Sequence, residues 1–456
     1  MNRELFAAVI EAKKEALTAL AQDIWAHPEL SLQEYHAAEV YTEFLRAEGF
    51  QVETNVGGIA TAFTGKYGSG RPVIGLLGEF DALDGLSQQG GAVTPSPVVP
   101  GGCGHGCGHH LLGVGALAAA IAVKAYLQER GEGTVVFYGC PGEEGGAAKA
   151  FLARDGAFRD LDAALTWHPD DKNEVVSGTC MASLQVEYEF TGTAAHAANC
   201  PQRGRSALDA AELMNMGVQF LREHIRPCDM VHYAIWDAGG RSPNVVQARA
   251  RLLYMVRSDC VKGAQEVLAR VDRIAEGAAL MTSTGVKRHF IDGTSDTVPN
   301  ETLETLLYEK LLEAKLPEYT EQELAFAAAL RKTFGEETGE PICRAVLPLR
   351  HSEDVTPGST DVGDVSHLTP TVQLHTAVFP LGTPGHSWQA VSAGAETAAC
   401  KGMLLAANVL AETAAALFES PETLAAAGAE FRRRTAGGYV CPIEPDAVPC
   451  IPGEPL

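Results

Sequence analysis

The 456-residue sequence has no excess of positive charge. Its 35 Lys and Arg residues are outnumbered by 58 Asp and Glu residues, and the formal net charge is −23 at pH 7. Such a protein repels the phosphates of nucleic acids and anionic membrane surfaces, so we expect neither as a partner. An acidic small molecule stays compatible with this charge, because a few local cations or metal ions can invert the field inside a cleft.

Long apolar segments are also missing. Charged residues recur through the first 20 positions, which therefore cannot form the apolar region of a signal peptide. The longest apolar run, Leu111–Val123, is shorter than the roughly 20 residues that a membrane-spanning helix needs. Eleven cysteines, an odd number in a long chain, favour reduced thiols over a disulfide framework. These absences predict a cytoplasmic protein without a membrane anchor.

Length and residue pattern predict two domains, because a chain of this size exceeds what one hydrophobic core usually supports. In residues 1–182 and again in 299–456, strand-like and helical runs predict an open mixed α/β sheet with helices on both faces. Residues 183–298 instead follow the order strand, helix, two strands, helix, strand, which is typical of a ferredoxin-like α+β sandwich. We therefore expect residues 183–298 to be a domain inserted into a catalytic domain.

Metal-capable side chains gather where predicted strands end or predicted helices begin. They fall in five short segments: Glu79–Asp81, Cys107–His109, Glu143–Glu144, His168 and His386. Open α/β sheets bind ligands outside the carboxyl ends of their strands, so the first four segments are expected to meet there. A mixture of thiolate, imidazole and carboxylate ligands suits Zn²⁺ or a similar divalent ion.

The segment Gly102–His110 alternates four glycines with two cysteines and three histidines. It opens a helix predicted from Leu111, and a tight turn at a helix N-terminus is expected to lower the pKa of Cys107 and to free it for a metal with His109. Spacing alone does not separate this pair from the neighbouring Cys103, His105 and His110. The alternative is a glycine-rich turn with solvated histidines; a zinc ribbon is excluded because no second cysteine pair lies nearby.

Glu143 and Glu144 follow the apolar strand predicted for Gly133–Cys140. Adjacent carboxylates at a strand end point in different directions, so one can bind a metal while the other accepts a proton from water. A Glu pair is more often a solvated surface feature, but the buried strand before it favours the catalytic interpretation. His168 and His386 are weak indicators when taken singly, because an isolated histidine is often structural.

Six motifs then stand out: GHGCGHHLLG at 104–113, PGEE at 141–144, WHP at 167–169, GTAAH at 192–196, GSTDVGDVS at 358–366 and GTPGHSW at 382–388. In this order they resemble the dinuclear-metal exopeptidases and amidohydrolases that include aminoacylase, glutamate carboxypeptidase and succinyl-diaminopimelate desuccinylase. The resemblance is strongest to the aminobenzoyl-glutamate hydrolase B-subunit branch. It implies a zinc-exopeptidase-like fold whose inserted domain serves as lid and dimerisation domain.

The resemblance also implies a role for each site residue. Two divalent ions, Zn or Mn, would be held by Cys107, His109, Glu144, His168 and His386. Glu143 would be the general base, and His196 the lid histidine that a partner subunit supplies to the oxyanion. Asn244 and Arg257 would hold a substrate carboxylate. Without that function, Asn244 would be a cap at the start of a strand and Arg257 a cation on the surface.

Two positions depart from the family pattern. Many relatives carry a His-x-Asp ligand motif where this chain has Glu79-Phe80-Asp81. Asp81 is therefore expected to orient His109 without binding metal itself, and the role of Glu79 stays open. Cys107 stands where many relatives have a bridging Asp, which leaves the metal open between Zn and Mn.

These features predict metal-dependent hydrolysis of the amide bond of an N-acyl or aroyl amino acid with a free carboxylate, such as aminobenzoyl-glutamate. A dipeptidase acting on β-alanyl or related dipeptides is the alternative, because it would use the same metals with a different side-chain pocket. An inactive metal-binding scaffold is a third interpretation, which the intact Glu143 and ligand set disfavour. A lid histidine supplied in trans requires a second chain, so we expect a homodimer, or a hetero-oligomer with a related subunit.

Overall fold

Two long apolar helices lie at the centre of the larger of two structural units. In the computed structural model, which describes residues 2–450, α3 (His109–Arg130) and α11 (Thr397–Glu419) pack against each other and against α1 (Asn2–Ala26). Both α3 and α11 are long and apolar enough to cross a membrane, but 89% and 78% of their most apolar stretches are buried inside the protein. Their apolarity therefore matches a place in the core.

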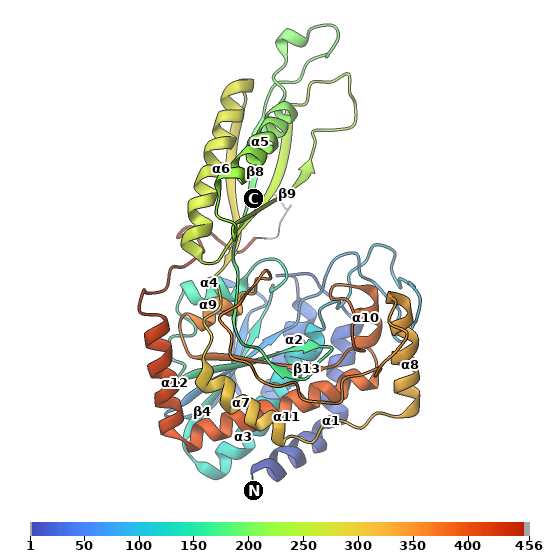
Figure 1. Ribbon diagram of the computed structural model, residues 1–456, viewed down its shortest axis with the longest axis vertical. Helices are drawn as coiled ribbons and strands as arrows, with labels where there is room; N and C mark the ends of the chain where they lie inside the picture. The colour runs from blue at the N-terminus through green and yellow to red at the C-terminus, as the bar shows by residue number, and fades with distance from the viewer. Residues whose placement is uncertain (1, 451–456) are drawn as a thin grey trace. The chain divides into compact units, whose positions relative to one another are not determined.

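Seven strands form the sheet of this unit, in the spatial order β1-β2-β4-β3-β5-β13-β6. Figure 1 labels β4 and β13 of this sheet. Their bounds are β1 (Gln51–Thr54), β2 (Phe63–Ser69), β3 (Val73–Glu79), β4 (Gly133–Cys140), β5 (Ala163–Asp170), β6 (Glu174–Val175) and β13 (Thr371–Ala377). Strands β4, β3, β5 and β13 are parallel, whereas β1, β2 and β6 pair antiparallel at the edges. The predicted open mixed α/β sheet is confirmed. All eight residues of β4 are buried, as its apolar sequence indicates.

Further helices complete this part of the fold: α2 (Tyr35–Ala47), α4 (Ala148–Arg154), α7 (Glu301–Glu313), α8 (Glu321–Arg331), α10 (Trp388–Gly394) and α12 (Pro421–Arg434), whereas the residues of the short helix α9 (Val362–Ser366) are divided between the two units. Residues 51–69 form an antiparallel hairpin of β1 and β2, with a turn between the two strands. Asn55 adopts the left-handed conformation with φ 58°, and Gly57 and Gly58 also have positive φ. Asn followed by glycines is a turn signal that the apolar residues on either side obscure.

The smaller unit contains an antiparallel sheet in the order β11-β8-β10-β9, with two helices packed on it. Its elements are β8 (Ala182–Thr191), α5 (Ala207–Leu221), β9 (Met230–Asp237), β10 (Arg249–Ser258), α6 (Val261–Thr282) and β11 (Gly285–Thr294). Buried residues such as Val186, Met214 and Val271 fill the space between sheet and helices. This order of elements confirms the predicted ferredoxin-like α+β fold.

Three described segments of the chain belong to the smaller unit: Thr179–Thr297, Val355–Asp364 and residues 440–450. Sequence analysis places only residues 183–298 there. The second segment joins because β12 (Val355–Thr356) pairs with β7 (Thr179–Cys180). The third is attached by the ion pair between Glu444 and Arg288 of β11. Such pairings between distant segments leave no local pattern in the sequence.

Candidate metal centre

Parallel strands bring metal-capable side chains to one edge of the larger unit's sheet. The last residue of β3, Glu79, stands beside Cys140, the last residue of β4, and the Glu143–Glu144 pair follows directly. His168 lies near the end of β5. Helix α3 begins at His109 after Gly108, which has φ 79° and where a Cβ atom would come within 2.8 Å of Pro169. Glycine at this position therefore lets the start of α3 approach the end of β5.

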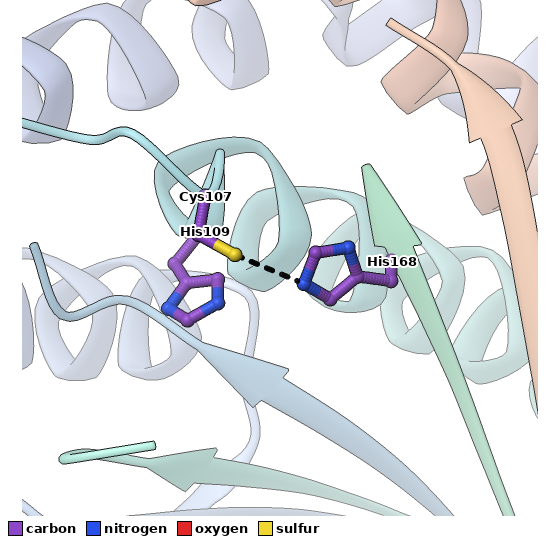
Figure 2. A group of neighbouring side chains, drawn as sticks. All are labelled: Cys107, His109 and His168. Atoms are coloured by element: carbon purple, nitrogen blue, oxygen red, sulfur yellow. Dashed lines mark hydrogen bonds between the residues drawn. The ribbon is translucent and has the colours of Figure 1, made fainter. Parts of the chain in front are cut away.

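The five predicted ligands form two overlapping groups. Cys107, His109 and His168 make up the first group, and Cys107, Glu144 and His386 the second; within each, the ligand atoms lie within 4.8 Å of one another. Figure 2 shows the first group, with Cys107 Sγ 3.4 Å from His168 Nε2. Because Cys107 belongs to both groups, its sulfur is placed between two candidate ion positions.

Hydrogen bonds at Nδ1 turn the Nε2 atoms of two histidines towards the candidate ligand groups. His109 Nδ1 donates to Asp81 Oδ1 at 2.8 Å, and His168 Nδ1 donates to the carbonyl oxygen of Pro169 at 2.7 Å. Burial alone would lower the pKa of His109, but Cys107 and Asp81 raise it well above its usual value, so a bound cation would displace a proton from His109 Nε2. Asp81 stays ionised: burial alone would raise its pKa, but His109, the Glu144 amide and Ser31 hydrogen-bond to it and lower that pKa to about 2.

Two atoms in the centre fit a bound cation. His109 Nε2 and Glu144 Oε1 are buried and 3.9 Å apart, and within residues 2–450 neither forms a hydrogen bond of good geometry, although Glu79 Oε2 lies 3.4 Å from the first atom and His386 Nε2 lies 3.3 Å from the second. Buried polar atoms are nearly always satisfied by protein, water or an ion. The donor set of imidazole, thiolate and carboxylate is the one that Zn²⁺ and similar ions accept. The residues present therefore fit a divalent metal centre.

The expected lowering of the Cys107 pKa is wrong. Burial raises the pKa of this thiol, and the neighbouring His109, although it outweighs the Glu144 and Glu143 carboxylates, does not offset the effect of burial. The dipole of a helix N-terminus is too weak to outweigh the loss of solvent. A thiolate at Cys107 therefore depends on the positive charge of a bound ion.

His386 reaches the centre from a strained backbone. Its φ is 51°, in the left-handed region that few residues other than glycine adopt. The His386 amide donates to the Gly106 carbonyl oxygen at 3.2 Å, and its Nε2 lies 3.3 Å from Glu144 Oε1. The neighbouring Glu144 carboxylate raises the pKa of His386. Strained residues of this kind cluster at functional sites, which agrees with a role for this imidazole in the centre.

Glu143 lies in a third group of close side chains, with Glu79 and His109. Glu79 is buried and pairs with the fully buried Lys149 of α4, whose Nζ lies 2.7 Å from Glu79 Oε1. Sequence analysis does not identify Lys149, because a lysine on a short helix normally indicates solvent. The pair supplies a cation that offsets one of the carboxylates crowded around His109.

The three residues left open at the Gly102–His110 turn point away from the ligand groups. Cys103 Sγ donates to the Pro28 carbonyl oxygen at 3.0 Å. His105 Nε2 donates to Ile24, and His110 Nε2 to Gly394, each to a carbonyl oxygen at 3.1 Å. These side chains therefore attach the turn to neighbouring segments, and Cys107 and His109 are the members that join the metal-capable groups.

The predicted lid residues lie in the smaller unit. His196 and Asn244 are on neighbouring loop segments, because Ala197 N donates to the Asn244 carbonyl oxygen at 2.9 Å. His196 is exposed, and its Nδ1 accepts hydrogen bonds from the amides of Ala198 and Asn199 at 3.2 and 3.1 Å. Its proton is therefore on Nε2, which is free to donate to an incoming group.

Arg257 is far from Asn244. It lies at the opposite end of β10 and donates to Ser359 Oγ, in the motif Gly358–Ser366. A ten-residue strand is on the order of 30 Å long. Within one chain, Asn244 and Arg257 are therefore too far apart to hold the same carboxylate. Ser359 is the neighbour of Arg257 that sequence analysis missed, although its motif had been singled out.

Comparisons with known proteins show which family and which relatives this chain resembles. A sequence model described as Peptidase family M20/M25/M40 matches residues 75–416. The chain is 46% identical to the B-subunit of p-aminobenzoyl-glutamate hydrolase from Escherichia coli (strain K12), over 96% of this chain and 97% of that protein. It is 29% identical to the Xaa-Arg dipeptidase of Mus musculus, over 93% and 90% respectively. A solved dinuclear metal-binding M20 peptidase from Bacillus subtilis has a TM-score of 0.56 at 20% identity, covering 90% of this chain and 99% of that one.

Proposed function

Because the chain belongs to peptidase family M20/M25/M40, we propose that it hydrolyses the amide bond of an N-acyl or aroyl amino acid such as aminobenzoyl-glutamate. The convergence of five potential ligands around two unsatisfied buried atoms, with Glu143 beside them, is the observation that carries this proposal. The identity to one subunit of a p-aminobenzoyl-glutamate hydrolase over nearly the whole chain supports the substrate class. A cytoplasmic location is part of the proposal.

Two divalent ions, Zn or Mn, are the proposed cofactors. Their ligands would be Cys107, His109, Glu144, His168 and His386. When bound, such ions supply Lewis-acid chemistry that lowers the pKa of water and polarises a carbonyl group. The position of Cys107 in both ligand groups supports a shared thiolate. The sulfur ligand favours Zn over Mn, since soft donors suit zinc better.

The chain's own residues then handle the proton and the substrate. Glu143 takes the proton of the attacking water and delivers it to the nitrogen of the leaving amine. Asp81 and the Pro169 carbonyl oxygen keep the rings of His109 and His168 in the orientation that turns Nε2 towards the candidate ligand groups. His196, which carries its proton on Nε2, donates to the oxygen of the carbonyl as negative charge develops there.

A second chain is the proposed source of His196. The smaller unit exposes large apolar side chains on α5 and on β9, the edge strand of its sheet: Met216 56%, Phe220 68%, Ile235 53% and Trp236 50% exposed. An apolar edge strand beside an apolar helix face is typical of a surface that another chain covers. A homodimer is the proposed assembly. A hetero-oligomer with a related subunit is the second candidate, since the name of the E. coli relative describes one subunit of a hydrolase.

Arg257 is the proposed reader of the substrate carboxylate, because its planar guanidinium can form two parallel hydrogen bonds with one. Asn244 would reach the same ligand only from the partner chain, together with His196. Arg257→Lys should lose most activity on a free acid and little on the matching C-terminal amide. Comparing kcat/KM for acid and amide in both proteins measures this. Equal rates on acid and amide in the wild type would mean that the carboxylate is not recognised.

A dipeptidase is the second candidate function, favoured by the 29% identity to an Xaa-Arg dipeptidase over most of both chains. The experiment that separates the two loads the protein with Zn²⁺ or Mn²⁺ and measures amine release from a panel of N-acyl and aroyl amino acids and β-alanyl dipeptides. Faster turnover of aminobenzoyl-glutamate supports the proposal. Turnover of dipeptides alone supports the alternative, and metal binding with no turnover of any compound would mean an inactive scaffold.

A further inference from the structure

The turn between α1 and α2, residues 29–34, contacts the segments that carry the metal centre. The Ala82 amide donates to the Glu29 carbonyl oxygen at 2.8 Å, and Leu30 forms a parallel β-bridge with Ala82. Ser31 Oγ donates to Asp81 Oδ2 at 2.8 Å. The turn is therefore attached to the residues that directly follow β3, including the carboxylate that orients His109.

The same turn holds the start of the loop that carries Glu143. Glu34 is completely buried, and its Oε1 accepts hydrogen bonds from the amides of Gly142 and Leu32, both at 2.8 Å. Its Oε2 accepts from Thr61 Oγ1 at 2.9 Å. One carboxylate oxygen thus joins the turn to Gly142, the residue immediately before Glu143.

Leu32 packs directly on this loop. Its φ is 63°, a left-handed conformation that is unfavourable for leucine. A Cβ atom on Gly142 or on Gly146 would come within 2.9 Å of the Leu32 side chain. The glycines on both sides of the Glu143–Glu144 pair therefore make room for Leu32, and this packing restrains the loop at both ends.

We propose that Ser31 and Glu34 are positioning residues for the metal centre and its general base. Glu34 acts through Gly142 on the place of Glu143, and Ser31 acts through Asp81 on the orientation of His109. The turn lies outside residues 75–416, which the family sequence model matches, so the inference stands on contacts in this chain. It rests on the proposed function in one respect, the role of Glu143 as base.

The first test compares Glu34→Ala with Glu34→Gln. Alanine leaves the amides of Gly142 and Leu32 without their acceptor, whereas the glutamine side chain keeps an oxygen in the same place. Displacing a catalytic group by about 1 Å can cost on the order of 100-fold in rate. We expect Glu34→Ala to lose kcat on that scale with unchanged KM and bound metal, and Glu34→Gln to keep most of the wild-type kcat.

A second readout does not need turnover. Amide hydrogen exchange over residues 141–147 of the metal-loaded protein should be faster in Glu34→Ala and unchanged in Glu34→Gln. Tyr35→Ala is the matched control, because Tyr35 adjoins Glu34 but is 62% exposed. Unchanged exchange in Glu34→Ala would overturn the proposal, as would equal impairment of Glu34→Gln.

Ser31 gives an independent test if Glu34→Ala fails to fold. Groups that orient a metal-binding histidine typically affect metal affinity by 10–100-fold. Ser31 does not contact His109 itself but the carboxylate that orients it, so we expect about tenfold weaker metal binding for Ser31→Ala. Ser31→Thr keeps the hydroxyl and should restore the affinity. Wild-type affinity in Ser31→Ala would overturn this half of the proposal. If the wild type hydrolyses no amide at all, the proposed function fails, while exchange and metal titration still decide the role of the turn.

Discussion

At the scale of single residues, the unsatisfied pair of His109 Nε2 and Glu144 Oε1 links metal binding to stability. A buried polar atom without a partner costs about 1–3 kcal/mol. A cation that binds both atoms removes that cost, and binding to the folded state alone raises the free energy of unfolding further. The metal centre is therefore expected to stabilise the larger unit as well as to catalyse.

Glu144→Gln and His386→Ala should each bind less metal than the wild type. Each substitution alters a ligand in the group formed by Cys107, Glu144 and His386, and the loss of a ligand weakens metal binding. Metal content after dialysis, measured by elemental analysis, and the midpoint of thermal unfolding should both fall. Wild-type metal content in both variants would remove these residues from the ligand set.

Glu143→Gln should keep its metal and lose turnover. The amide side chain has a similar volume but cannot accept a proton from water, and proton transfer by a positioned side chain typically contributes 10²–10⁴-fold to the rate. The expected loss of kcat is therefore at least about 100-fold. Single-turnover assays with matched metal content check this. Wild-type turnover in the variant would exclude Glu143 as the base.

At the scale of helices and strands, Glu323 shows how a helix start is fastened to the core. It closes a capping box with Thr320 at the start of α8, and Lys401 Nζ of α11 lies 2.6 Å from its Oε2. Burial alone would raise its pKa, but Lys401 and the Thr320 amide outweigh burial and lower the pKa from 4.5 to about 2. A carboxyl group whose pKa is lower in the folded than in the unfolded protein stabilises the fold at pH values above its unfolded-state pKa. This stabilisation is lost as the pH falls through its folded-state pKa.

Glu323→Gln should therefore lower the free energy of unfolding by about 1–3 kcal/mol at pH 7, the usual value of a hydrogen bond to a charged group. The difference from the wild type should shrink as the pH falls from about 4.5 towards 2, because the wild-type carboxylate then becomes protonated. Urea denaturation of both metal-free proteins at pH 7 and at low pH measures this. A difference that stays constant with pH would assign the effect to packing.

Much of this element structure follows from local pattern. The all-apolar run from Gly133 to Cys140 predicts β4 with its observed bounds, and the ligand segments at strand ends predict the place of the centre. The contributions of Lys149 and Glu34 could not be predicted. A lysine is expected in solvent, and the Glu34 carboxylate meets Gly142 across 108 positions of sequence. Contacts between residues so far apart in the sequence are determined by the fold, and no periodic pattern in the sequence indicates them.

At the scale of the whole molecule, His196 and the metal-capable residues belong to different units. Whether His196 acts in a neighbouring chain can therefore be tested by mixing two inactive variants. His196→Ala and Glu143→Gln are each expected to be inactive. If His196 acts in a neighbouring chain, hybrid dimers contain one complete site, and mixing the two variants should restore part of the activity. Absence of recovery after demonstrated subunit exchange would exclude action in trans.

The division of the chain between the units has a consequence for protein engineering. The chain passes from one unit to the other at five points, after residues 178, 297, 354, 364 and 439. Removing residues 179–297 and joining the cut ends would leave Val355–Asp364 and the C-terminal segment without the sheet and helices to which they belong. A shortened catalytic unit would need three separate pieces of chain spliced with new linkers. Deletion libraries and evolutionary trimming of the smaller unit should therefore fail far more often than substitutions within it.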